Sequence, residues 1–307
     1  MKKYKILLLG YSNLAKKKLI KTFIKNKIRF CVASISQNKK IFGAYEQFQS
    51  YDEGLEKSSA DIVYISLPNS LHYTWAKKAL ELGYHVIIDK PICDSLEKTK
   101  SLINIAKKYK RLLSEAIFFD YHKQIQTALK LSGGTKNIKY INANFIIPKP
   151  KKNDFRNSKK LKGGALMDMG CYASSIAAIF CSKKIITKKT IIKKNNLGLV
   201  TSFNFIFDFY SQVYSGQFKH GGEYQNNLTI YTDNKIISLN RVFSPPVNLN
   251  MKITVKENNQ TKVYIIKKDN TFENYFTEVT RLISNKKYGY YFNKMIKINE
   301  FIDTLKA

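Results

Sequence analysis

The 307-residue sequence predicts an α/β protein with two domains of different architecture. Up to about residue 120, short apolar runs alternate with helical patterns, as is typical of a doubly wound parallel sheet with right-handed crossovers. From residue 121 onward, long alternating runs follow one another with few helices between them, which favours an α/β domain with a mostly antiparallel, open sheet. We therefore expect one domain over residues 1–120 and a second over 121–307.

In the first domain, the expected strands are short runs rich in Ile, Leu and Val, a composition typical of strands that are buried on both faces. Gly10 ends the first run, Pro68 closes the third, and Gly83 stops a helix, because Gly and Pro interrupt regular structure. The predicted elements are a strand over 5–10, a helix over 13–24, strands over 29–35 and 61–67, a helix over 71–82, a strand over 85–88, a helix over 95–109 and a strand over 112–118.

The second domain begins with a helix over 124–131 that ends at a pair of glycines. Apolar and polar residues alternate in the runs that follow, which is the pattern of strands with one buried face. A longer helix follows a second glycine pair and extends over 163–181, and two helices close the chain. The predicted strands cover 139–147, 200–209, 213–219, 227–232 and 252–266, and the closing helices cover 273–284 and 294–306.

The chain has a formal net charge of +31, yet only five of its 53 basic residues are arginines. Proteins that read bases or clamp phosphates rely on the planar guanidinium of Arg. Lysines spread along the whole chain are more typical of a solvated surface, although a polyanion-binding protein remains an alternative. We expect no specific nucleic-acid partner, but the charge favours anionic small ligands.

No apolar run approaches the roughly 18 residues that cross a bilayer, so no membrane segment is expected. Ile6–Leu9 is too short for the apolar part of a signal peptide and fits a buried strand better, which predicts a cytoplasmic protein. The four cysteines have neither metal-site nor disulfide spacing, and we expect no metal.

The segment Gly10-Tyr-Ser-Asn-Leu-Ala15 lies where the first strand meets the first helix. The dinucleotide-binding fingerprint Gly-x-Gly-x-x-Gly/Ala occupies that place, with Ser12 here replacing its middle glycine. A plain strand-to-helix turn is the alternative. Because a helix N-terminus offers free amides and a positive dipole end to a pyrophosphate, Gly10, Ser12, Asn13 and Leu14 are predicted to contact the cofactor.

Two further segments carry polar residues at informative places. In Lys162-Gly-Gly-Ala-Leu-Met-Asp-Met-Gly-Cys-Tyr172, Asp168 stands four residues before Tyr172, so the carboxylate and the phenol share one helix face. Lys90-Pro91 closes an apolar run at the expected carboxyl end of a strand. Capping, packing and surface exposure would account for each residue singly. Together, a lysine, a carboxylate and a phenol suit proton transfer at a sugar hydroxyl or carbonyl.

These segments resemble the glucose-fructose oxidoreductase / inositol dehydrogenase (Gfo/Idh/MocA) family of NAD(P)-dependent oxidoreductases. That family carries Glu-Lys-Pro after its fifth strand and a Gly-Gly-(small)-Leu-x-Asp-x-Gly-x-(His or Tyr) helix, which read here Asp89-Lys90-Pro91 and Gly163 to Tyr172. The resemblance implies an N-terminal Rossmann domain, hydride transfer, and catalytic Lys90, Asp168 and Tyr172. Lys90 and Tyr172 are expected to meet across the domain cleft, and Lys90 and Asp89 to contact the cofactor.

Two other stretches extend the cofactor site that the resemblance implies. Ser66-Leu-Pro-Asn-Ser-Leu-His72 is similar to the family's Thr-Pro-Asn-x-x-His loop, which assigns Leu67, Asn69 and His72 to the cofactor. The second strand lacks the carboxylate that normally binds the ribose of NAD, and Ser34 and Lys39 follow it instead. We therefore predict NADP(H) in preference to NAD(H).

The resemblance also implies a substrate site. Arg156 stands in a loop where the family often has an arginine, so the substrate is assigned to Lys90, Arg156, Asp168 and Tyr172. Leu239-Asn-Arg-Val-Phe-Ser-Pro-Pro246 resembles a segment of the nucleotide-linked 3-ketosugar reductases, although a strand that ends in a stiff turn would look the same.

We predict reduction of a nucleotide-linked ketosugar in deoxysugar or surface-glycan synthesis, by a homo-oligomer (dimer or tetramer). The alternatives are a catabolic dehydrogenase of a free sugar or polyol, and a non-enzymatic, nucleotide-sensing regulator of the same fold.

Overall fold

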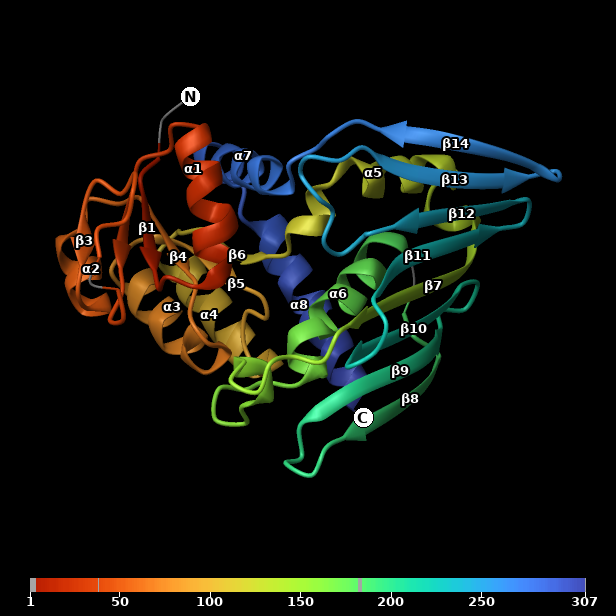
Figure 1. The fold of residues 1–307 in the computed structure, drawn as a ribbon, viewed down its shortest axis with the longest axis horizontal. Coiled ribbons are helices and arrows are strands. Elements are labelled where there is room, and N and C mark those ends of the chain that lie inside the picture. The colour runs from red at the N-terminus through yellow and green to blue at the C-terminus, as the bar shows by residue number, and fades with distance from the viewer. Residues whose placement is uncertain (1–3, 38, 182–183, 307) are drawn as a thin grey trace. The chain divides into compact units, whose positions relative to one another are not determined.

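The computed structural model describes residues 4–37, 39–181 and 184–306. The chain divides into two compact units, each formed by two stretches of sequence (Figure 1). The first unit comprises Met1–Ala116 and Phe272–Ile296, and the second comprises Ile117–Thr271 and Lys297–Ala307. The division therefore falls within the last helix.

The first unit contains a six-stranded parallel sheet in the order β3-β2-β1-β4-β5-β6. This is the doubly wound Rossmann order, and it confirms the predicted fold class. The elements are β1 (Ile6–Leu9), η1 (Ala15–Leu19), α1 (Ile20–Lys25), β2 (Phe30–Ala33), β3 (Gln47–Phe48), α2 (Tyr51–Lys57), β4 (Ile62–Ile65), η2 (Asn69–Leu71), α3 (His72–Glu81), β5 (His85–Asp89), α4 (Leu96–Lys108), β6 (Leu113–Ala116) and α7 (Thr271–Ser284).

Helix α7 completes the core of the first unit from far along the chain. Phe276 meets the ring of Phe23 at a centroid distance of 5.1 Å, and the Tyr275 hydroxyl lies 2.7 Å from Ser114 Oγ. Both α7 side chains are buried, so the helix contributes apolar contacts that the first 116 residues do not provide by themselves.

The second unit contains an eight-stranded sheet in the order β14-β13-β12-β11-β7-β10-β9-β8. Only β7 and β10 pair in parallel, so the sheet is mostly antiparallel, as predicted. The elements are η3 (Phe118–Tyr121), α5 (Lys123–Leu131), η4 (Thr135–Asn137), β7 (Ile138–Ile147), η5 (Phe155–Asn157), α6 (Ala165–Phe180), β8 (Thr187–Lys194), β9 (Val200–Asp208), β10 (Val213–His220), β11 (Gln225–Thr232), β12 (Lys235–Asn240), β13 (Met251–Glu257), β14 (Gln260–Ile266) and α8 (Gly289–Lys306).

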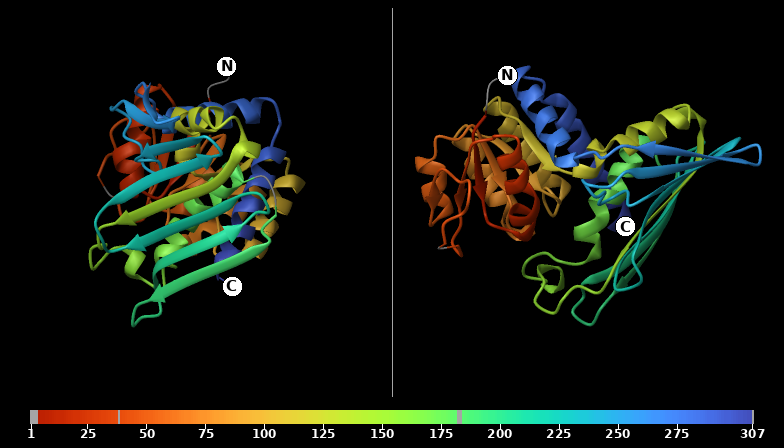
Figure 2. Two further views of the ribbon diagram at one scale, coloured as in Figure 1. Left: turned by 90° about the vertical axis from the view of Figure 1, so that its right-hand side faces the viewer. Right: turned by 45° about the horizontal axis from the view of Figure 1, so that its top comes forward.

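One face of this sheet packs against α5, α6 and the last part of α8 (Figures 1 and 2). Phe203, Phe205 and Phe207 alternate along β9 toward that face, and Phe301 of α8 meets the ring of Phe205 at 5.8 Å. Truncating one such ring to Ala typically costs about 3–5 kcal/mol, so the helical face holds the unit together.

The opposite face of the sheet carries a row of five amide side chains, which we call the amide row. Cross-strand register aligns its members on five neighbouring strands, and Asn144 Nδ2 donates to Asn227 Oδ1 at 3.1 Å. None of the five is charged. The amide row consists of Asn204, Gln217, Asn144, Asn227 and Asn240.

The structure corrects several predicted elements. The run 252–266, predicted as one strand, is the hairpin β13–β14, whose turn residues Asn258 and Asn259 have φ angles of 49° and 60°. Asn is one of the residues that adopt positive φ in two-residue hairpin turns. The strands β3, β8 and β12 and the helix α2 were not predicted, and α8 begins five residues earlier than expected.

Candidate active site

The turn after β1 is built around Gly10, which has a φ angle of +93°. A Cβ atom at this position would lie 2.4 Å from the carbonyl oxygen of Ser66 and 2.6 Å from Leu67 Cδ2. Only glycine fits this turn, because a side chain would collide with the end of β4. Residues 13–25 then form a helical segment in which Ala15–Leu19 is a π-helical turn, a feature that is frequent at functional sites.

Ser12 takes part in a chain of hydrogen bonds beneath this turn. Its Oγ accepts the amide proton of Ala15 at 3.2 Å and lies 2.7 Å from Ser66 Oγ, which donates to Asp89 Oδ2 at 2.8 Å. The Tyr64 hydroxyl donates to the other oxygen of Asp89. Since the Ser66 hydroxyl donates its proton to Asp89, the Ser12 hydroxyl must donate to Ser66. These hydrogen bonds therefore run from Ser12 through Ser66 toward Asp89. The chain connects the carboxyl ends of β1, β4 and β5.

Asn13 and Leu14 begin the helical segment that follows the turn, and Asn13 is exposed. The first amides of a helix have no partner within the helix, and the Ser12 side chain takes only that of Ala15. The turn therefore fits the pyrophosphate of a dinucleotide, which needs free amides and close backbone approach. The Ser12 hydroxyl in place of the fingerprint's glycine is accommodated because it points to Ser66.

His72 connects two loops of the first unit. Its ring is fully buried, with Nε2 2.8 Å from the carbonyl oxygen of Leu67 and Nδ1 2.8 Å from that of Pro91. Burial lowers the pKa of His72, against the influence of these two carbonyls. The side chain thus holds the loop after β4, which carries Asn69, beside the loop after β5, which carries Lys90.

The end of β2 carries no carboxylate. Ser34 is buried, and its Oγ accepts the amide proton of Ser36 at 3.4 Å, whereas Lys39 is exposed. Asn38 lies outside the described residues.

Lys90 directly follows β5 and is partly exposed, and burial raises the pKa of its neighbour Asp89. Lys90 therefore lies at the carboxyl edge of the parallel sheet, where ligands bind in folds of this kind.

In the second unit, the glycine pair lets a loop turn back against α6. A Cβ atom on Gly163 would lie 2.5 Å from the carbonyl oxygens of Phe155 and Arg156, and the Gly164 amide donates to the latter at 2.9 Å. Gly164 has a φ angle of +96°, which favours glycine. The pair thus brings the loop that contains Arg156 to the start of α6.

Asp168, in the first turn of α6, is held by two cationic or polar side chains. Arg156 Nε lies 2.7 Å and His220 Nε2 3.0 Å from the same oxygen, Asp168 Oδ2. Asp154 holds the other side of the guanidinium, with Nη1 to Oδ1 at 3.2 Å. Asp168 is buried, and a buried carboxylate requires such compensation. Arg156, which the sequence resemblance assigns to the substrate, therefore forms an ion pair with Asp168, another predicted site residue.

Tyr172 follows one turn later on the same face of α6. Its ring is surrounded by three phenylalanines: Phe145 at 5.5 Å, Phe119 at 5.6 Å and Phe243 at 5.6 Å between centroids. These distances are those of attractive aromatic pairs, so they hold the ring on several sides while the side chain remains partly exposed. We call Phe119, Phe145 and Phe243 the aromatic cage.

Several contributors to this site were not among the predicted site residues, namely His220 and the three phenylalanines of the aromatic cage. His220 is one of four histidines and ends β10, but it is 52 residues from Asp168, and only the fold brings them together. Phe243 lies in the predicted Arg-Val-Phe-Ser-Pro-Pro segment, but nothing in the sequence connected it with Tyr172. A histidine directly after the predicted strand 213–219 was the available signal.

Replacing Arg156 with Ala is expected to lower the free energy of unfolding by about 2 kcal/mol. The change removes the cation that compensates a buried carboxylate. Breaking a fully buried ion pair typically costs about 3–5 kcal/mol, and the value expected here is smaller because the Arg156 side chain is 28% exposed. Urea unfolding followed by circular dichroism measures this difference. Lys160→Ala, in the same loop and exposed, is the matched control. Equal unfolding midpoints in both variants would show that the pair contributes no stability.

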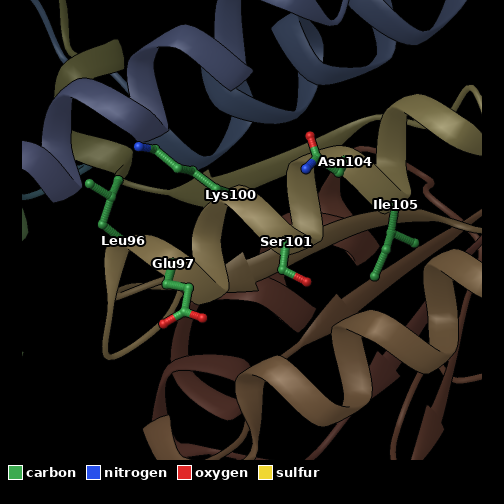
Figure 3. Close-up of a pocket in the computed structure, with 6 residues that line it drawn as sticks. All are labelled: Leu96, Glu97, Lys100, Ser101, Asn104 and Ile105. Carbon is green, nitrogen blue, oxygen red and sulfur yellow. The ribbon is translucent and has the colours of Figure 1, made fainter.

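A surface hollow of about 610 Å³ runs along α4 (Figure 3). The residues that line it recur three and four positions apart, so they share a helix face. None of them belongs to the predicted site. They are Leu96, Glu97, Lys100, Ser101, Asn104 and Ile105.

Other features of the described residues bear on cofactors and membranes. Among residues 4–37, 39–181 and 184–306, no three His, Cys, Asp or Glu side chains cluster as metal ligands would. Burial raises the pKa of Cys31 to about 11 and that of Cys93 to about 12, which makes these free thiols unreactive. In the same described ranges, no helix is long and apolar enough to cross a membrane.

Comparisons with known proteins agree with this architecture. The chain is 27% identical over 203 residues to a dTDP-3,4-didehydro-2,6-dideoxy-alpha-D-glucose 3-reductase of Streptomyces violaceoruber, covering 64% of this chain and 59% of the relative. It is 26% identical over 226 residues to the enzyme of the same name from Actinomadura kijaniata, covering 72% and 68%. These alignments thus span about three fifths and two thirds of the relatives' lengths.

The fold resembles that of a 3-ketoreductase from Actinomadura kijaniata, solved in complex with NADP and TDP-benzene. The TM-score is 0.92 at 21% identity, over 99% of this chain and 97% of the other. At that identity, the likeness concerns the fold. Residues 5–117 match the family model described as the oxidoreductase family with an NAD-binding Rossmann fold (Gfo/Idh/MocA).

Proposed function

We propose that the protein is an NADP(H)-dependent oxidoreductase that reduces the ketone of a nucleotide-linked sugar. The observation that carries the proposal is the arrangement on α6, where a buried carboxylate held by Arg156 and His220 stands one turn before Tyr172. Relatives that match more than half of this chain are named as 3-reductases of a dTDP-linked dideoxy sugar.

The first unit offers the residues for the cofactor. The turn at Gly10 and the amides of Asn13 and Leu14 suit the pyrophosphate, and Ser34 with Lys39 suit a 2′-phosphate. Asn69 and Lys90 follow neighbouring parallel strands, β4 and β5, and suit the nicotinamide ribose. Three other predicted cofactor residues, Leu67, His72 and Asp89, are proposed to hold these loops in place rather than to bind the cofactor through their own side chains.

In the proposed reaction, the bound nicotinamide supplies a hydride to the carbonyl carbon. Tyr172 gives its phenolic proton to the carbonyl oxygen, so the ketone becomes an alcohol with one hydride and one proton gained. Asp168 accepts hydrogen bonds from sugar hydroxyls while Arg156 and His220 hold its orientation.

Turnover assays with purified protein test the proposal. NADPH oxidation should be observed with dTDP-3,4-didehydro-2,6-dideoxy-glucose, and the product alcohol should be identified by mass spectrometry. A second arm offers NADP⁺ with D-xylose and other free sugars or polyols. Turnover only in the second arm would replace the proposal by the alternative of a catabolic dehydrogenase, which one relative favours. That relative is a D-xylose 1-dehydrogenase (NADP(+)) of Haloferax volcanii, 30% identical over 53% of this chain.

A non-enzymatic, nucleotide-sensing regulator is the remaining alternative for this fold. The combined presence of Lys90, Asp168 and Tyr172 argues against it, since a sensor needs no proton donor. Cofactor binding without turnover in any arm would favour the regulator.

NADPH is expected to bind at least about tenfold more tightly than NADH, which corresponds to about 1.4 kcal/mol. The reason is that β2 ends without a carboxylate, so Ser34 and Lys39 can meet the 2′-phosphate. Fluorescence titration of both cofactors measures the ratio. Ser34→Asp should reverse it, because a carboxylate repels the phosphate and binds ribose hydroxyls. A preference for NADH that Ser34→Asp leaves unchanged would contradict this assignment.

We propose that the protein lies in the cytoplasm. We also propose that it binds no specific nucleic acid. Because the lysines are dispersed and arginines few, duplex DNA should bind only weakly, without sequence preference, and be released by about 0.2 M salt. A filter-binding assay against several duplexes at two salt concentrations tests this. Tight binding of one duplex at physiological salt would contradict it.

We also propose a homo-oligomer, a dimer or a tetramer, formed through the amide row. The members of this row are uncharged, so two copies that pair there bring no like charges of the row together, in a chain of net charge +31. Light scattering after gel filtration measures the mass, and Asn144→Lys should shift it toward the monomer.

A further inference from the structure

We propose that Phe243 positions the ring of Tyr172 for proton transfer, which makes the Arg-Val-Phe-Ser-Pro-Pro segment part of the catalytic apparatus. The inference rests on the proposed function of Tyr172 and adds to it a residue that acts through the ring of Tyr172.

Phe243 contacts both other rings of the cage as well as Phe218 of the core, whose ring lies 5.7 Å away. Its ring stacks on Phe145 at 5.1 Å with an interplanar angle of 29° and meets Phe119 edge-on at 5.2 Å. Both of these rings also contact Tyr172, and Phe243 itself lies tilted by 39° against the phenol ring. Phe243 thus touches Tyr172 directly and also touches the two other rings that hold it.

The backbone at Phe243 is fixed by one buried amide of β11. Asn226 Oδ1 accepts the amide proton of Phe243 at 2.9 Å, and Asn226 Nδ2 donates to Ser244 Oγ at 2.9 Å. The Arg241 amide donates to the carbonyl oxygen of Asn226, and Arg241 has a φ angle of +53°. Three hydrogen bonds to a single residue leave this turn little freedom, so it can hold the Phe243 ring in a fixed place.

A fixed ring matters because a tyrosine hydroxyl can be misplaced only by rotation about two side-chain bonds. The cage restricts both rotations, so the hydroxyl keeps one direction. Proton transfer requires the donor within about 2.6–3.2 Å of its acceptor, and an error of about 1 Å can lower a rate by 10²-fold. Opening one wall of the cage should therefore lower the rate of the chemical step more than the affinity for substrate.

The experiment compares Phe243→Leu with Phe207→Leu. Phe207 is a matched control, because it is also buried in the same core and its ring contacts Phe205 and Phe301 rather than the cage. Phe243→Leu should lower kcat about tenfold with KM within about twofold of the wild type, whereas Phe207→Leu should leave kcat nearly unchanged. Phe243→Tyr keeps the ring and should restore most of kcat. All assays are run below the unfolding transition of each variant.

A second measurement does not depend on turnover. In protein labelled with ¹³C at the tyrosine ζ carbon, the signal of Tyr172 is identified by its loss in Tyr172→Phe. Without cofactor, this signal should shift toward the position of free tyrosine and broaden in Phe243→Leu, and should stay unchanged in Phe207→Leu, because only the first variant removes a wall of the cage and its ring current.

An unchanged Tyr172 signal in Phe243→Leu overturns the inference, and so does a fall in kcat no greater than that of Phe207→Leu. If the wild type turns over no ketosugar, the proposed function fails instead, and the Tyr172 signal alone then decides whether Phe243 holds the ring.

Discussion

Replacing Tyr172 with Phe is expected to lower kcat by about 10²-fold or more, with cofactor affinity unchanged. The substitution removes only the hydroxyl, and the ring keeps its contacts with the aromatic cage, so the fold should be retained. General acid catalysis by a positioned side chain typically contributes roughly 10²–10⁴-fold, which sets the expected size of the loss. Steady-state kinetics with NADPH and a dTDP-linked ketosugar measure it.

Tyr290→Phe is the control for this variant, because Tyr290 is 60% exposed and the same hydroxyl is removed far from α6 in sequence. Its kcat should equal that of the wild type. Near-normal turnover in Tyr172→Phe would remove the phenol as the acid and leave Lys90 or a bound water as the proton donor.

Lys90→Ala should also lower kcat by about 10²-fold or more, and it should in addition weaken cofactor binding. The ammonium group is proposed to donate to the substrate oxygen and to a ribose hydroxyl, so its loss affects both steps. This double effect distinguishes Lys90 from Tyr172, whose loss should be visible only in kcat. Kinetics and fluorescence titration of NADPH on the same preparation separate the two.

Lys100→Ala provides the matched lysine control, since Lys100 lies on the exposed face of α4 and outside the proposed site. If Lys90→Ala kept its turnover, the lysine after β5 would be reduced to a structural residue. Weaker cofactor binding with normal turnover would instead show that Lys90 binds the cofactor ribose and takes no part in the chemical step.

The parallel sheet was predictable because its strands have a local sequence signature. β1 and β4 are buried on both faces, and continuous short apolar runs such as Ile6–Leu9 are typical of strands in that environment. The second sheet was predicted in kind but not in detail. β8 lies at a sheet edge and carries so many lysines that it lacks a strand's apolar signature. The two asparagines of the β13–β14 turn lie in a polar run, 256–262, which the predicted strand 252–266 includes.

The candidate site was predictable where its residues are close in sequence. Asp168 and Tyr172 are one helical turn apart, so a period of 3.6 residues is enough to place them on one face. His220 and Phe243 come from β10 and from the turn after β12, and no local pattern relates them to α6. The ion pair between Arg156 and Asp168 could not be predicted for the same reason, since it depends on a loop that turns back on the glycine pair.

The two edges of the eight-stranded sheet have opposite character. β8 exposes four lysines (Lys188, Lys189, Lys193 and Lys194) beside Ile191, whereas β14 exposes Val263 and Ile265 beside one lysine, Lys262. Charged edge strands repel further strand addition, and apolar ones permit it. Within this sheet, pairing between two β14 strands therefore meets less charge repulsion than pairing that involves β8. A second copy that paired through β14 would leave a lysine-rich β8 at each outer end, which disfavours further strand addition through this sheet.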